Sequence, residues 1–99
     1  MITFYRSAVI LPGKTPKAIE FAKQVSALVK KLNGVELHVG MPVGGNPSRI
    51  GWSSSYESMA AMEAAMVKMT SSAKYWDLLN KTGDIFLAGS VTDEIWRSV

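Results

Sequence analysis

Apolar residues change their spacing several times along the chain, and these changes predict its secondary structure. Residues 2–11 are rich in β-branched and aromatic side chains and end at a Pro-Gly turn signal, which predicts a first strand. Along residues 16–33 the apolar side chains recur every three or four positions, as in an amphipathic helix. Thr15 stands where an N-cap is expected, and Asn33-Gly34 suits the end of this helix.

The middle of the chain predicts two strands joined by a loop. Residues 35–41 alternate strictly between apolar and polar side chains, which is typical of a half-buried strand. A segment rich in Gly, Asn and Pro follows, and residues 49–53 are extended again. This pattern indicates a hairpin with a long loop.

The last third of the chain predicts helix and then strand. Ser54 and Glu57 have the spacing of a capping box before a row of methionines, which predicts a helix over residues 55–69. A shorter helical segment follows and ends near Thr82. Residues 85–92 are extended in pattern and predict the final strand.

The order of these elements predicts the fold class. A β-α-β-β-α-β order is typical of a ferredoxin-like α+β domain, whose four-stranded antiparallel sheet carries both helices on one face. Residues 1–99 then form a single domain. One sheet face stays uncovered, although 47% of the residues are apolar and the C-terminal segment is aromatic. We therefore expect a homodimer that forms through the open sheet face.

The chain resembles the dimeric α+β barrel superfamily, within which it is most similar to antibiotic-biosynthesis monooxygenase and NIPSNAP-like proteins. The resemblance rests on the length, the element order, the passage RIGWSSSYESMAAMEA at 49–64 and the downstream YWDLL at 75–79. It implies a dimeric barrel and a range of activities that includes cofactor-free oxygenation. Several enzymatic branches carry a His on the second helix. Here that helix has Met59, Met62, Glu63 and Met66, a departure that argues against haem ligation.

Composition and charge exclude several classes of function. The absence of Cys excludes disulfides and thiolate chemistry, and a single His argues against a metal site, so we expect no cofactor. No apolar run approaches the length of a membrane span, and a cytoplasmic protein is expected. The net charge of +3 comes mostly from lysines off the apolar stripe of the first helix, which is typical of a solvated face. An RNA-recognition motif is disfavoured because serines of the third strand stand where stacking aromatics are needed, so we expect no nucleic-acid partner.

Two polar residues are candidates for the chemistry of a site. His38 is the only side chain whose usual pKa lies near neutrality, and it is the candidate for acid–base catalysis, with a hydrogen-bonded or interface His as the alternative. Arg6 lies in the middle of a strand on the face that also carries Phe4 and Ala8. A buried Arg needs a partner, so Arg6 is either half of an internal ion pair or an anchor for a ligand.

Aromatic side chains are the candidate walls of a pocket. Trp52, Tyr56, Tyr75 and Trp76 could line a site for a flat organic molecule between the sheet and the second helix, or could be ordinary core residues. The methionine row fits core packing, with an adaptable pocket wall as the alternative. Two functions stay open. One is binding of a hydrophobic or aromatic metabolite, with cofactor-free monooxygenase-like turnover. The other is a non-catalytic binding or assembly module.

Overall fold

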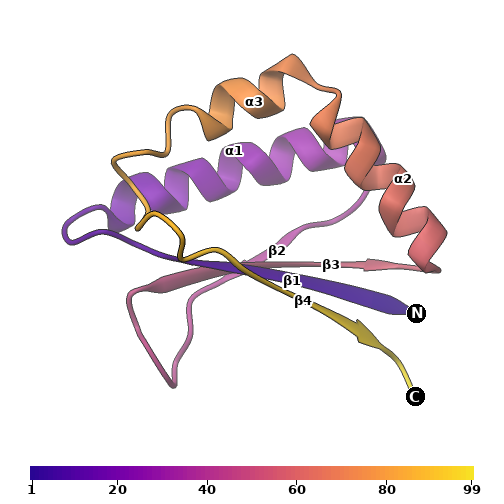
Figure 1. The fold of residues 1–99 in the computed structure, drawn as a ribbon, viewed down its shortest axis with the longest axis horizontal. Coiled ribbons are helices and arrows are strands. Elements are labelled where there is room, and N and C mark those ends of the chain that lie inside the picture. The colour runs from indigo at the N-terminus through magenta and orange to yellow at the C-terminus, as the bar shows by residue number, and fades with distance from the viewer.

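Three helices lie on one side of a four-stranded antiparallel sheet in the computed structural model, which describes all 99 residues (Figure 1). The elements in chain order are β1 (Ile2–Val9), α1 (Thr15–Asn33), β2 (His38–Gly40), β3 (Arg49–Tyr56), α2 (Met59–Thr70), α3 (Ala73–Leu79) and β4 (Thr92–Arg97). The predicted ferredoxin-like α+β class is confirmed. The short helix α3 adds a third helix to the two that the element order required.

The sheet has the strand order β2-β3-β1-β4, so β1 is central and β4 forms an edge. Each strand pairs antiparallel with its neighbour. One row of directly opposed residues crosses the whole sheet and consists of Asp93, Arg6, Trp52 and Val39. Because opposed residues share a face, these four side chains belong to the same side of the sheet.

The core lies between this side of the sheet and the helices. Successive strand residues point to opposite faces, so β1 buries Ala8 and β3 buries Ile50 and Trp52. Three aromatic rings meet edge to face, with centroid distances of 5.6–6.2 Å among Phe21 of α1, Trp52 and Phe86. These contacts fasten the longest helix and the segment before β4 onto the middle of the sheet.

The sequence predicts the C-terminal end of α1 correctly but not its N-terminal end. Gly34 has φ of 66° and its N–H donates to the carbonyl of Lys30, which closes the helix in the left-handed conformation that glycine adopts readily. At the other end Lys14 is the N-cap residue and makes no side-chain capping bond. The prediction that Thr15 caps this helix was wrong, because Thr15 is already its first residue.

The start of α2 also differs from the prediction. Ser54 is buried inside β3, which continues to Tyr56 because residues 53–56 pair with Ile2–Tyr5 of β1. The helix begins only at Met59, and Ser58 is the cap whose side chain accepts a hydrogen bond from the Ala61 N–H at 3.1 Å. The predicted Ser54–Glu57 capping box therefore does not form.

The last strand lies later in the chain than predicted. Residues 85–91 are irregular and make only an isolated bridge between Phe86 and Ile10, whereas β4 spans Thr92–Arg97. Ile85 is buried and Phe86 packs against the core, so this segment contributes apolar side chains to the core without forming a strand. All six residues of β4 are exposed.

No element covers the second face of the sheet (Figure 1). By strand alternation this open face carries Tyr5 and Ser7 from β1, Ser53 from β3, His38 from β2 and Trp96 from β4. It is therefore a mixed surface of aromatic and small polar side chains.

None of the helices is both long enough and apolar enough to pass through a lipid bilayer.

Candidate functional site

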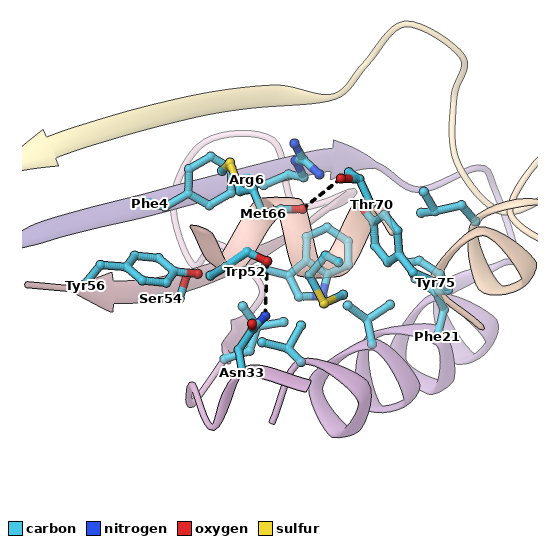
Figure 2. Close-up of a pocket in the computed structure, with 16 residues that line it drawn as sticks. Phe4, Arg6, Phe21, Asn33, Trp52, Ser54, Tyr56, Met66, Thr70 and Tyr75 are labelled. Atoms are coloured by element: carbon cyan, nitrogen blue, oxygen red, sulfur yellow. Dashed lines mark hydrogen bonds between the residues drawn. The ribbon is translucent and has the colours of Figure 1, made fainter. Parts of the chain in front are cut away.

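A cavity of about 200 Å³ lies between the helix-facing side of the sheet and the three helices. Hydrophobic side chains make up 12 of its 16 lining residues, which are Phe4, Arg6, Phe21, Val25, Val29, Asn33, Leu37, Trp52, Ser54, Tyr56, Ala65, Met66, Met69, Thr70, Tyr75 and Leu79. Figure 2 shows these side chains converging from β1, β3 and the helices. A small, half-open space lined mainly by apolar and aromatic groups is typical of a ligand pocket.

The sheet supplies one wall of this cavity through the alternation of β1 and β3. Phe4 and Arg6 on β1 point to the same side as Trp52, Ser54 and Tyr56 on β3 (Figure 2). Only every second residue of a strand can face the helices, so Tyr5 and Ser53 are excluded from the cavity. The alternation of residues along β1 and β3 therefore determines which polar and aromatic side chains face the cavity.

Helix α3 contributes Tyr75 and Leu79 to the opposite wall, beside residues of α1 and α2. Trp76, the neighbour of Tyr75, is half exposed and does not line the cavity. The Trp76 indole N–H donates to the carbonyl of Thr70 at 2.8 Å, and its ring lies 5.6 Å from that of Tyr75. Of the four aromatic residues proposed from the sequence, the structure brings Trp52, Tyr56 and Tyr75 together, while Trp76 contacts Tyr75 from outside.

Arg6 is the only charged residue that lines the cavity. Its Nε and Nη2 atoms donate to the two carboxylate oxygens of Asp93 at 2.7 and 2.9 Å. The pair is partly open to solvent, with side chains 39% and 40% exposed. The hydrogen bond to Asp93 raises the pKa of Arg6, partial burial opposes this, and the charge of Asp93 together with the Tyr75 side chain raises the pKa further.

Phe4 supports the guanidinium group of Arg6 from one side. The Cζ atom of Arg6 lies 5.4 Å from the centroid of the Phe4 ring, within the range of a cation–π contact. Asp93 stands directly opposite Arg6 in the pairing of β1 with β4. Arg6 is therefore held by contacts on its own strand and on the neighbouring one.

Two further polar groups of the cavity wall are donors without an acceptor in the protein. The Trp52 indole N–H is buried and has no acceptor in the protein. Ser54 donates its hydroxyl hydrogen to the Tyr56 oxygen at 3.1 Å, so the Tyr56 hydroxyl hydrogen is free to donate elsewhere. Buried polar groups are nearly always hydrogen-bonded, which makes the unpaired Trp52 N–H a notable feature of this wall.

The methionine row divides between surface, core and cavity. Met59 is exposed, Met62 is buried in the core, and Met66 and Met69 line the cavity. Core packing is thus confirmed for Met62, whereas Met66 and Met69 lie in the wall of the cavity. Thioether side chains adapt to irregular shapes, so these two methionines form an adaptable wall.

His38 lies on the other side of the sheet from this cavity. It stands opposite Ser53 on the open face and is exposed. There it borders a shallow concavity of about 500 Å³ that is also lined by Tyr5 and Arg49. The structure therefore does not bring His38 together with Arg6 and the aromatic residues that line the cavity.

Sequence reasoning missed Asp93, which is the residue in closest contact with Arg6. Its position was assigned to the chain after the predicted last strand, so the pairing with Arg6 could not be foreseen. Phe4 and Phe21 were also missed as lining residues. No three residues among His, Asp and Glu lie close enough together to hold a metal ion.

Comparison with known proteins adds information about the fold. No family model and no curated protein sequence matches the chain. An uncharacterized NIPSNAP domain protein from Burkholderia xenovorans superposes with a TM-score of 0.83 at 10% identity, over 100% of this chain and 95% of its own. A NIPSNAP family protein from Agrobacterium tumefaciens gives 0.82 at 14% identity, over 99% and 85%.

A second group of solved structures is also similar. A protein from Nitrosomonas europaea, provisionally named an antibiotic biosynthesis monooxygenase, gives a TM-score of 0.75 at 15% identity, over 100% of this chain and 99% of its own. At these identities the likeness concerns architecture alone. The chain thus has the ferredoxin-like α+β fold that NIPSNAP-domain proteins share with antibiotic biosynthesis monooxygenase-like proteins.

Proposed function

We propose that this protein binds a small hydrophobic or aromatic molecule in the cavity between the sheet and the helices. The observation that carries the proposal is the cavity itself, which brings five aromatic side chains together around one arginine. Apolar and aromatic surface that stays open to water is unfavourable, and a bound molecule would cover it. An apolar space of this size is therefore best explained by a ligand that occupies it.

The size of the cavity limits the ligand. About 200 Å³ is below the roughly 300–1,000 Å³ that is usual for drug-sized ligands. It is closer to the roughly 150 Å³ apolar cavity that is known to accept benzene in another protein. We therefore propose a molecule of about one ring, or a short chain of similar bulk.

Monooxygenase-like turnover without a cofactor is part of this proposal. It is supported by the fold neighbours that carry this provisional name. The cavity is lined by no His, Asp, Glu or Lys. The chain would contribute by orienting the bound molecule and by excluding water, while Arg6 and the tyrosines offer hydrogen-bond donors.

We also propose a homodimer that forms through the open sheet face, in a cytoplasmic protein. The cysteine-free composition supports that location. The accessible surface of the chain is 6401 Å², whereas a monomer of this mass exposes about 5,500 Å². The excess of about 900 Å² is close to the roughly 800 Å² that each partner buries in a standard interface. A function that lies only in this assembly is the alternative to ligand binding.

Binding of single-ring probes tests the proposed function. Ethylbenzene and acetophenone are added to the purified protein, and binding is followed by saturation-transfer NMR and by the shift in thermal midpoint. We expect saturable binding of at least one probe, since binding to the folded state alone raises the midpoint. Oxygen uptake with electron-rich aromatic substrates tests turnover separately. No saturable binding by any single-ring probe would overturn the proposal and favour the assembly module.

A further inference from the structure

The Arg6–Asp93 pair determines the charge at the polar end of the cavity. Arg6 lines the cavity, whereas Asp93 contacts Arg6 from the edge strand β4 and does not line it. The two groups are joined by two parallel hydrogen bonds at 2.7 and 2.9 Å. This fork geometry is the strongest form of arginine–carboxylate pairing, so the positive charge of Arg6 is already compensated.

The guanidinium group still has hydrogen atoms to donate. A guanidinium carries five N–H bonds, and Asp93 takes one from Nε and one from Nη2. Of the three N–H bonds that remain, the Tyr75 side chain lies close enough to accept one, and the others have no acceptor among the side-chain hydrogen bonds of the protein. Because Arg6 lines the cavity, its remaining N–H bonds are available to a bound molecule, while Asp93 compensates its positive charge.

The neighbouring polar groups have the same character. The Tyr56 hydroxyl hydrogen is free, the Trp52 N–H has no acceptor, and Tyr75 lies close enough to Arg6 to raise its pKa. No carboxylate, imidazole or ammonium group lines the cavity. This wall is suited to a ligand that accepts hydrogen bonds and carries no charge of its own.

A ligand carboxylate would meet an electrostatic penalty here. It would compete with Asp93 for one guanidinium and place two like charges around it in a partly desolvated site. A neutral carbonyl oxygen accepts the free N–H bonds without this repulsion. The two ligand classes are similar in size, so the charge of Asp93 is what separates them.

We propose that the cavity selects a neutral, carbonyl-bearing molecule of about one aromatic ring, and that Asp93 is the residue that sets this specificity by compensating Arg6. The inference rests on the proposed ligand-binding function and adds the chemical class of the ligand. Asp93 acts through Arg6 and is a positioning residue. Arg6 is the residue that contacts the carbonyl oxygen.

Three matched probes test the proposal on the wild-type protein. Acetophenone and benzoate have the same number of heavy atoms and differ in charge, and ethylbenzene replaces the carbonyl of acetophenone with a methylene group. We expect acetophenone to bind at least about tenfold more tightly than benzoate, and more tightly than ethylbenzene. Benzoate that binds as tightly as acetophenone would overturn the proposal, and so would ethylbenzene that binds more tightly than acetophenone.

The variant Asp93→Asn tests the role of Asp93. It keeps the shape of the side chain and removes the charge that compensates Arg6. We expect benzoate to gain about tenfold in affinity, with acetophenone changed by less than about threefold. The matched control Asp77→Asn removes an exposed carboxylate on α3 outside the cavity and should leave all affinities unchanged.

The outcomes separate the two proposals. An unchanged affinity for benzoate in a folded Asp93→Asn protein would overturn the specificity inference alone, provided that ethylbenzene or acetophenone binds. Failure of all three probes on the wild-type protein would overturn the ligand-binding function together with the inference. If Asp93→Asn does not fold, the ranking of the probes on the wild-type protein remains decisive, because it needs no variant.

Discussion

Arg6 and Asp93 stand directly opposite each other on β1 and β4, and two hydrogen bonds at 2.7 and 2.9 Å join them on the helix-facing side of the sheet. The pair connects a central strand to an edge strand whose six residues are all exposed. It therefore adds a side-chain contact to the backbone pairing of β4 with β1 and also sets the charge of the cavity wall. The interpretation of Arg6 as half of an internal ion pair and the interpretation as a ligand anchor are compatible, because the guanidinium faces both Asp93 and the cavity.

Removal of the pair should cost little stability. Asp93→Asn is expected to lower the free energy of unfolding by about 0.5–1 kcal/mol, because the pair is about 40% exposed and water screens it. For a domain of this size that corresponds to a fall of a few degrees in the thermal midpoint. The raised pKa of Arg6 keeps it protonated far above neutrality, so its contribution is lost only in strong alkali and should be constant between pH 6 and pH 9. Thermal melts across this pH range, with Asp77→Asn as control, measure both effects.

Filling the cavity should block ligand binding without unfolding the protein. Ala65 on α2 is buried and lines the cavity, so Ala65→Leu places three additional carbon atoms there. We expect single-ring probes to lose at least about tenfold in affinity, while the free energy of unfolding changes by less than about 1 kcal/mol, because the added atoms enter empty space. Ala64→Leu is the control, since Ala64 is the exposed neighbour on the same helix. Equal affinities for the two variants would place the binding site elsewhere.

His38 should not contribute to binding in this cavity. It lies on the open face, and the sheet separates it from the aromatic residues that line the cavity. His38→Gln is therefore expected to leave the affinity for single-ring probes within about twofold of the wild-type value, because no contact with a bound molecule is lost. Titration of both proteins with acetophenone checks this. A loss of tenfold or more would show that the open face takes part in binding.

The sequence predicts the fold better than it predicts the site, for physical reasons that particular residues illustrate. The β-branched and aromatic content of residues 2–11, with the Pro-Gly turn after it, and the three- and four-residue spacing in residues 16–33 predicted β1 and α1 close to their true bounds. β4 was misplaced because its residues are mostly charged or polar, as suits an edge strand. The more apolar residues 85–92 matched a strand pattern, yet residues 85–91 are irregular, and Ile85 and Phe86 pack against the core.

The candidate site depended on contacts that sequence patterns do not contain. Trp52, Tyr56 and Tyr75 come from β3 and α3, and their approach depends on the packing of α3 over the sheet. Ser54 was interpreted as a helix cap because its spacing to Glu57 is correct, but pairing of β3 with β1 extends the strand through it. Tertiary pairing overrides a local capping signal in this case.

Gly34 should be required for the end of α1, whereas Gly83 should not. Gly34 has φ of 66°, which a side chain disfavours even though the space around it is open. Gly34→Ala is expected to lower the free energy of unfolding by about 1 kcal/mol. Gly83→Ala has open space and no positive φ, so it should be neutral or slightly stabilising. Denaturant titrations of the two variants compare them directly, and equal effects would contradict the role of the left-handed cap.

Trp96 should be important for the proposed homodimer. It lies opposite Thr3 on the open face and is 59% exposed in the single chain. Val67 on α2 is 58% exposed but lies on the helical side of the molecule, so it is a matched control. Trp96→Lys places a charge on the open face and is expected to raise the dimer dissociation constant at least about tenfold, because buried aromatic residues dominate interface energies. Val67→Lys should leave the constant unchanged. Sedimentation equilibrium at micromolar concentration measures both variants, and a monomeric wild-type protein there would contradict the dimer.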